Sequence, residues 1–206
     1  MNLVYIHGAN ASPDSFNFIR MGLGDSAGGI GLALEYDSAD GFFNNLQSMR
    51  AQLAGIDDIF FIAHSLGGIY ALHLAQLLAE RVLGAVTLAT PYGGSQAAQW
   101  IKWLLPCSQL LRDIHPHSAP ILQAQRIRLQ QPWTNIVTTG GHSPLMAAAN
   151  DGVVTAVSMR CRSDIALVEV AANHYEVVLS HHALTIIRAA LQRTAQNSQA
   201  GNAACI

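Results

Sequence analysis

The chain has 206 residues, which suits one domain with a substantial core. Half of the residues are hydrophobic and 12% are charged, against roughly 25% in ordinary soluble domains, and this composition excludes intrinsic disorder. The net charge of −2 gives a nucleic acid no electrostatic hold, and no uninterrupted apolar run reaches the length of a transmembrane helix.

Along the first ninety residues, short apolar runs alternate with helical patterns. Strands are expected at 3–6, 31–36, 59–63 and 84–89. Helices are expected at 42–53 and 66–81. The run at 59–63 is apolar throughout, which is typical of a strand that is buried on both faces.

Residues 92–132 break this alternation, because they contain four prolines and the tryptophans Trp100 and Trp103. We interpret this segment as an insertion, a candidate cap over one end of a sheet, with a possible helix at 97–105. The alternation then resumes. Strands are expected at 135–139 and 165–171, a terminal helix at 183–194 and a frayed tail at 195–206.

Strands that alternate with helices indicate βαβ units and a parallel sheet. The sequence therefore predicts one α/β domain over residues 1–206, with about six mostly parallel strands and helices on both faces.

The most informative motif is Ala63-His64-Ser65-Leu66-Gly67, between an apolar strand and a helix. A serine on so sharp a turn exposes its hydroxyl, and the turn requires small residues two positions before and after it. Ala63 and Gly67 are small, so Ser65 is the candidate nucleophile. A plain glycine-rich turn is the alternative. The side chain of His64 is expected to point away from the site.

A serine nucleophile needs a base and an acid, which follow it in the chain in this kind of motif. Asp151 lies in a loop after the 135–139 strand, although Asn-Asp-Gly can also be an ordinary turn. Asp164 precedes a strand and would lie at the wrong end of the sheet. His174 follows the 165–171 strand by a short loop, where α/β sites form. His181 and His182 open the terminal helix, so Asp151 and His174 are the preferred partners.

The expected oxyanion hole needs two backbone N–H donors. Leu66, directly after the nucleophile, is one candidate. Ala9, in the loop after the first strand, is the other, with Asn10 as its alternative. His7 is expected to have a structural role.

Several motifs together resemble the α/β-hydrolase family, and within it small bacterial lipases and esterases. They are the His-Gly loop at 3–10, the elbow at 63–68, the Thr-Pro-x-x-Gly-Ser-like turn at 89–95, the acid loop at 150–154 and the histidine loop at 173–176. The resemblance implies a minimal form of that fold and hydrolysis of carboxylic esters through an acyl-enzyme.

Two alternatives remain open at this point. The same three residues could serve an acyltransferase or a thioesterase, because pocket shape and water exclusion choose the acceptor. The chain could also be a hydrolase-fold protein that binds a ligand without catalysis. A small-molecule or lipid acyl ester is the expected substrate, with transient contact to a membrane surface through residues 92–132. Acyl-chain length and oligomeric state stay open.

No metal or other cofactor is expected, because the paired histidines, His115 with His117 and His181 with His182, lack a third ligand at metal-site spacing. The cysteines are three and widely separated, which favours reduced thiols. The first residues form a strand pattern instead of a signal peptide, so a cytoplasmic protein is expected.

Overall fold

A computed structural model of the chain describes residues 1–24, 31–95, 108–143 and 146–203. The strands of these residues form one sheet in the order β2-β1-β3-β4-β5-β6, and every neighbouring pair is parallel. The strands are β1 (Asn2–Ile6), β2 (Gly31–Leu34), β3 (Ile59–His64), β4 (Val82–Leu88), β5 (Trp133–Thr138) and β6 (Ala166–Val170). The predicted six-stranded parallel sheet is confirmed.

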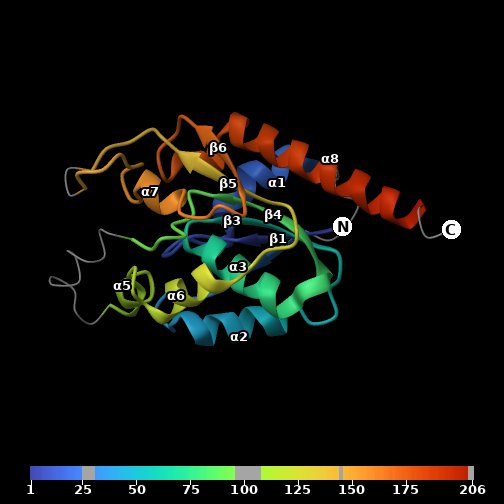
Figure 1. Ribbon diagram of the computed structural model, residues 1–206, viewed down its shortest axis with the longest axis horizontal. Coiled ribbons are helices and arrows are strands. Elements are labelled where there is room, and N and C mark those ends of the chain that lie inside the picture. The colour runs from blue at the N-terminus through green and yellow to red at the C-terminus, as the bar shows by residue number, and fades with distance from the viewer. Residues whose placement is uncertain (25–30, 96–107, 144–145, 204–206) are drawn as a thin grey trace.

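Helices cover both faces of the sheet, as predicted (Figure 1). One face carries α1 (Asn17–Leu23) and α8 (His181–Ala203), and the other carries α2 (Phe42–Gln52), α3 (Leu66–Leu78) and α6 (Ala119–Arg126). The shorter helices are η1 (Pro13–Phe16), η3 (Ala79–Arg81), α5 (Gln109–Asp113), α7 (Ala156–Met159) and η4 (Glu176–Leu179).

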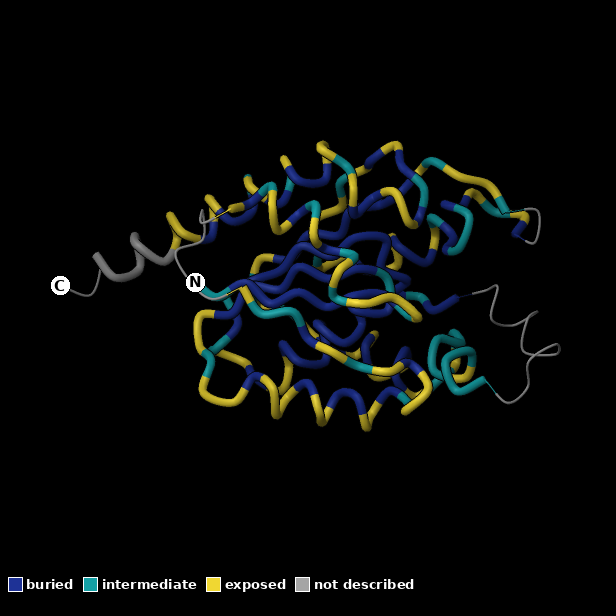
Figure 2. Tube along the Cα trace, turned by 180° about the vertical axis from the view of Figure 1, so that it is seen from behind, coloured by how far each residue is buried: buried dark blue, intermediate teal, exposed yellow. Residues whose placement is uncertain are grey.

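The sheet separates two hydrophobic clusters, and neighbouring residues of one strand contribute to opposite clusters. On β3, Phe61 and Ala63 pack with α2 and α3, whereas Phe60 and Ile62 pack with α1 and α8. All six residues of β3 are buried. Figure 2 shows the central strands buried and the outer sides of the helices exposed. The apolar runs in the sequence therefore reflect strands that are covered on both faces.

The terminal helix corrects one prediction. It begins at His181 and runs to Ala203, so the tail predicted to fray from residue 195 is helical that far. Residues 195–200 contain no glycine or proline, so nothing in this segment stops helix propagation. The side chains of 195–197 are exposed, so these three residues lengthen the helix without adding to the core.

The candidate cap at 92–132 is described only in part. Residues 96–107, with Trp100, Trp103 and the helix expected at 97–105, lie outside the described residues. The described remainder forms α5 and α6, and the backbone oxygen of Pro120 in α6 accepts a hydrogen bond from His73 Nε2 of α3 at 3.0 Å. This part of the insertion is therefore tied to the main domain. None of the described helices combines the length and apolar character needed to span a bilayer.

Candidate active site

Ser65 lies in the turn between β3 and α3, at the carboxyl edge of the sheet. Its φ of +51° belongs to the left-handed region, which is rare for a residue other than glycine. Its N–H donates to the backbone oxygen of Leu88 at 2.8 Å, which anchors the turn to β4. A Cβ on Gly67 would lie 2.2 Å from the backbone oxygen of Ile6. The requirement for a small residue after the serine is therefore a direct steric one.

The structure brings together the three side chains that the sequence selects. His174 Nε2 lies 3.0 Å from Ser65 Oγ, and His174 Nδ1 lies 2.8 Å from Asp151 Oδ2. His174 is 3% exposed and Asp151 is 1% exposed, whereas Ser65 is partly accessible. The three residues follow β6, β5 and β3 in turn, so the parallel sheet gathers them at one edge.

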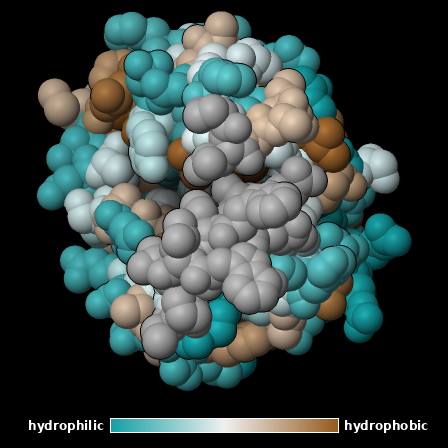
Figure 3. Space-filling model, turned by 90° about the vertical axis from the view of Figure 1, so that its left-hand side faces the viewer, coloured by the Kyte–Doolittle hydropathy of each residue, from teal (hydrophilic) through white to brown (hydrophobic). Residues whose placement is uncertain are grey.

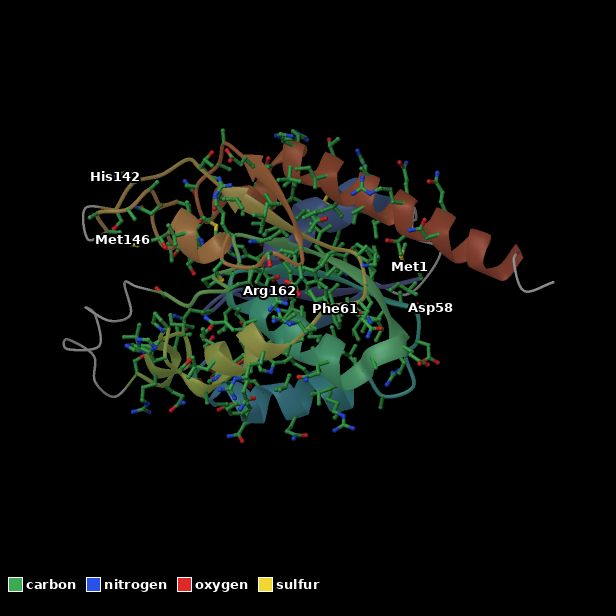
Figure 4. The ribbon with its side chains drawn as sticks, in the orientation of Figure 1. Met1, Asp58, Phe61, His142, Met146 and Arg162 are labelled. Atoms are coloured by element: carbon green, nitrogen blue, oxygen red, sulfur yellow. The ribbon has the colours of Figure 1, made fainter. Side chains whose placement is uncertain are left out.

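That edge lies opposite the start of the chain. Met1 and Asp58 mark the edge where strands begin, and His142 and Met146, from the segment that leads to Asp151, mark the other (Figure 4). Figure 3 faces this second edge, and its described surface mixes hydrophilic and hydrophobic side chains.

The carboxylate of Asp151 is surrounded by donors. Thr138 Oγ1 donates to Oδ2 at 2.5 Å, and the N–H groups of Val153 and Val154 donate to Oδ1 at 3.0 and 2.7 Å. Burial raises the pKa of this carboxyl, but the hydrogen bonds from His174, Thr138 and Val154 outweigh it, so the net pKa lies below the ordinary value. Asp151 is therefore held as a carboxylate. Thr138 is not predicted from the sequence, where its only signal is a hydroxyl at the end of a strand.

The backbone of His174 is fixed on both sides. Its N–H donates to the backbone oxygen of Asp151 at 3.1 Å, and its carbonyl oxygen lies 2.8 Å from His64 Nε2. The side chain of Asn173 accepts hydrogen bonds from the N–H groups of Tyr175 and Glu176, which shapes the turn after it. These hydrogen bonds thus fix the position of His174, which belongs to no helix or strand.

The loop after β1 holds one peptide in a defined orientation. The backbone oxygen of Gly8 lies 2.8 Å from His7 Nδ1 and accepts a second hydrogen bond from the N–H of Ala11 at 3.3 Å. In a trans peptide the N–H points opposite to the carbonyl, so the N–H of Ala9 is directed away from these partners. His7 is buried and stacks on Tyr36 at 4.2 Å between ring centroids, as suits a structural residue.

The two candidates for the oxyanion donor in this loop differ in availability. The N–H of Asn10 donates to Ser38 Oγ at 3.1 Å. Within the described part of the chain, the N–H groups of Ala9 and Leu66 donate to no protein acceptor. The geometry therefore favours Ala9 over Asn10 as the partner of Leu66.

The acid and the histidines that the sequence disfavours as site residues lie elsewhere. Asp164 pairs with Arg162 at 2.5 Å, and His181 and His182 are exposed at the start of α8. Among the described residues, no three side chains of the kinds that bind metals gather as a metal ion would need.

Comparison with solved structures finds several hydrolases whose fold is similar to that of this chain. The mature lipase BlEst2 from Bacillus licheniformis has a TM-score of 0.67 at 17% identity, over 92% of this chain and 91% of the lipase. Phospholipase PlaB from Legionella pneumophila has a TM-score of 0.71 at 14% identity, over 91% of this chain and 58% of the phospholipase. The metagenomic carboxyl esterase MGS0156 has a TM-score of 0.71 at 19% identity, over 86% of this chain and 65% of the esterase.

This chain thus spans less than two thirds of the phospholipase and of the esterase, and nearly the whole of the lipase. Comparison of the sequence itself finds no matching protein family and no matching curated protein. The likenesses in structure, together with the parallel sheet and its strand order, establish that the chain has the α/β-hydrolase fold, in a minimal form.

Proposed function

We propose that the protein is a serine hydrolase that cleaves carboxylic esters through an acyl-enzyme. Ser65 is the nucleophile, His174 is the general base, and Asp151 is the carboxylate that orients His174. The observation that carries the proposal is the continuous hydrogen-bonded series from Ser65 Oγ through His174 to Asp151. A serine in a left-handed turn between a strand and a helix supports it, because that conformation presents the hydroxyl to a substrate.

In the first half of the proposed reaction, Ser65 Oγ attacks the ester carbonyl while His174 Nε2 accepts its proton. The carbonyl oxygen becomes an oxyanion, which the N–H groups of Ala9 and Leu66 stabilise. The intermediate then collapses, the bond to the alcohol oxygen breaks, and His174 returns the proton to that oxygen. The alcohol leaves and the acyl group remains on Ser65.

In the second half, a water molecule attacks the acyl-enzyme and gives its proton to His174. Collapse releases the carboxylic acid and restores Ser65. Asp151 fixes the ring of His174 with Nδ1 protonated and stabilises the imidazolium through its negative charge. The lowered pKa of Asp151 supports this role, because the carboxyl stays ionised throughout the neutral range.

For the substrate we propose an acyl or lipid ester. The similar structures carry the names lipase, phospholipase and carboxyl esterase, and these names agree with one class of bond. We propose that an acyl chain or a membrane surface approaches the site through residues 92–132. Transfer of the acyl group to an alcohol, and cleavage of a thioester, use the same three residues and differ only in the acceptor or the leaving group.

Hydrolysis of p-nitrophenyl esters from acetyl to palmitoyl tests the proposal. The wild type should hydrolyse part of this series, and Ser65→Ala should lower kcat by about 10⁴-fold or more if the three residues act as a unit. A fluorophosphonate should label the wild type on Ser65 and leave the variant unlabelled.

Full activity in Ser65→Ala would contradict the mechanism. Labelling of Ser65 without hydrolysis of any ester would favour acyl transfer, and failure of both assays would favour a protein that only binds its ligand.

A further inference from the structure

His64 occupies an unusual place in the site, because it adjoins Ser65 in the chain but its ring lies behind the reacting groups. The residue is 5% exposed. On one side, its Nε2 lies 2.8 Å from the carbonyl oxygen of His174. On the other side, a Cβ added to Gly8 would come within 2.8 Å of its Nδ1. The ring therefore fills the space between the loop of His174 and the loop of Ala9.

The contact with His174 defines the protonation of the ring. A carbonyl oxygen can only accept, so Nε2 of His64 carries a proton and donates it. Burial, the nearby ring of His174 and, more weakly, His7 lower the pKa of His64 to about 3. They outweigh the hydrogen bond to the carbonyl of His174 and the charge of Asp151, which both raise this pKa. His64 is therefore neutral, with Nδ1 unprotonated, throughout the range in which a histidine base operates.

The donated hydrogen bond matters because of where His174 stands. It belongs to a loop after β6, and its N–H and its carbonyl are held by Asp151 and His64 respectively. Without His64 the buried carbonyl would lack a donor, which costs about 1–3 kcal/mol unless the peptide turns toward another partner. A turn of that peptide would move the imidazole relative to Ser65 Oγ.

We propose that His64 is a positioning residue for the general base, which holds the peptide of His174 so that Nε2 faces Ser65 and which contributes no charge beside the imidazolium. This inference rests on the proposed function. A second positive charge at the 4.9 Å that separates the two ring centroids would oppose protonation of His174 during the reaction.

Two substitutions distinguish the effect of the hydrogen bond from the effect of the imidazole ring itself. In His64→Gln, the side-chain amide nitrogen can reach the position of Nε2, whereas in His64→Asn it is one methylene too short. With p-nitrophenyl butyrate, we expect His64→Asn to lower kcat by about 10²-fold, as a misplaced base does, with KM little changed. His64→Gln should recover most of this loss.

A matched control exists in α3. His73 is equally buried and its Nε2 lies 3.0 Å from the backbone oxygen of Pro120, a bond of the same kind. His73→Asn should lower the melting temperature and leave kcat for p-nitrophenyl butyrate unchanged. Equal kcat values for His64→Asn and the wild type, or equal losses in the Asn and Gln variants of His64, would overturn the proposal.

A measurement on the wild type needs neither turnover nor a variant. In protein labelled with ¹⁵N-histidine, the shifts of His64 should report the Nε2-protonated neutral ring from pH 8 to pH 5. Titration of His64 near pH 6.5, or protonation of its Nδ1, would overturn the inference even if the wild type hydrolysed no ester. Ester hydrolysis and labelling of Ser65 decide the proposed function separately.

Discussion

At the scale of single residues, the site combines a strained backbone conformation with a carboxylate whose two oxygens both accept hydrogen bonds. Ser65 has a backbone conformation that costs about 1–3 kcal/mol and persists because neighbouring structure imposes it. Asp151, by contrast, has donors on both oxygens of its carboxylate. The proposed nucleophile is thus exposed by strain, and its proposed carboxylate partner is immobilised by hydrogen bonds.

Thr138→Val should show how much the threonine hydroxyl contributes to Asp151. At pH 7 the variant should lose about 2 kcal/mol of unfolding free energy, because a hydrogen bond to a buried carboxylate disappears. The pKa of Asp151 is lowered in the fold, so its stabilisation is present above the ordinary value and is lost as the pH falls through the lowered one. Urea unfolding at pH 7 and pH 3 should therefore give a smaller difference at pH 3.

Thr138→Ser is the matched control for this experiment, since it keeps the hydroxyl and removes only a methyl group. It should retain most of the stability of the wild type at pH 7. Equal losses for the Ser and Val variants would show that the hydrogen bond is unimportant.

The sequence predicts Ser65, Asp151 and His174 because each follows a recognisable strand, because the chemistry demands these residue types, and because the resemblance to α/β hydrolases implies their order in the chain. It does not predict Thr138 or the contact of His64. That contact joins residues 110 positions apart, and no local pattern encodes how two loops approach each other. The same limit explains why the sequence leaves Asn10 as an alternative to Ala9, since the hydrogen bond from the N–H of Asn10 to Ser38 joins two loops that are distant in the chain.

At the scale of elements, the strands begin and end within two residues of their predicted bounds, since strands covered on both faces read as apolar runs. The short helix α1 escaped prediction. Its Gly22 disfavours a helix by itself, and the residue lies where any Cβ would meet the side chain of Leu184 in α8. Close packing between distant helices, which the sequence does not reveal, explains that glycine.

The close approach of the start of α3 to the end of β1 leads to a further prediction. Gly67→Ala would place a Cβ against the backbone oxygens of Ile6 and His7, which cannot move aside as a side chain can. The start of α3 should shift away from β1, separating the N–H of Leu66 from that of Ala9. We expect a lower melting temperature and a lower kcat for p-nitrophenyl esters.

Ala79→Gly, after the other end of α3, is the control for this variant. Ala79 has a φ of +44° and is exposed, so glycine should relieve strain, raise the melting temperature and leave kcat unchanged. An active Gly67→Ala variant with unchanged stability would contradict the steric argument.

At the scale of the whole molecule, buried histidines should make the fold sensitive to acid. Burial lowers the pKa of His7, His64 and His73. In the unfolded chain these histidines take up protons below about pH 6.5, whereas in the folded protein they do not. The free energy of unfolding is therefore highest above that pH and decreases as the pH falls below it. With a folded pKa of about 3, His64 alone should cost about 2 kcal/mol between pH 7 and pH 5.

Urea unfolding at pH 7.5, 6 and 5 measures this loss. The slope against pH should be shallower in His64→Gln, which removes one of the three groups. A stability that stays constant from pH 7.5 to pH 5 would show that these rings titrate normally in the folded protein.

The low charge of the chain also has its explanation at this scale. A sheet covered on both faces needs apolar residues on both sides of each strand, and the two clusters supply them. Composition alone indicated an apolar protein, but it could not distinguish a doubly covered sheet from an exposed apolar surface.

The arrangement of the termini has a practical consequence. Met1 precedes β1, and α8 runs back along the sheet, so both ends of the described chain lie at the edge remote from Ser65 (Figure 1). The last turns of α8 project beyond the body of the domain as a helical stem. A protein tethered to a bead or an electrode through that stem would therefore turn the edge that carries Ser65 toward the solution.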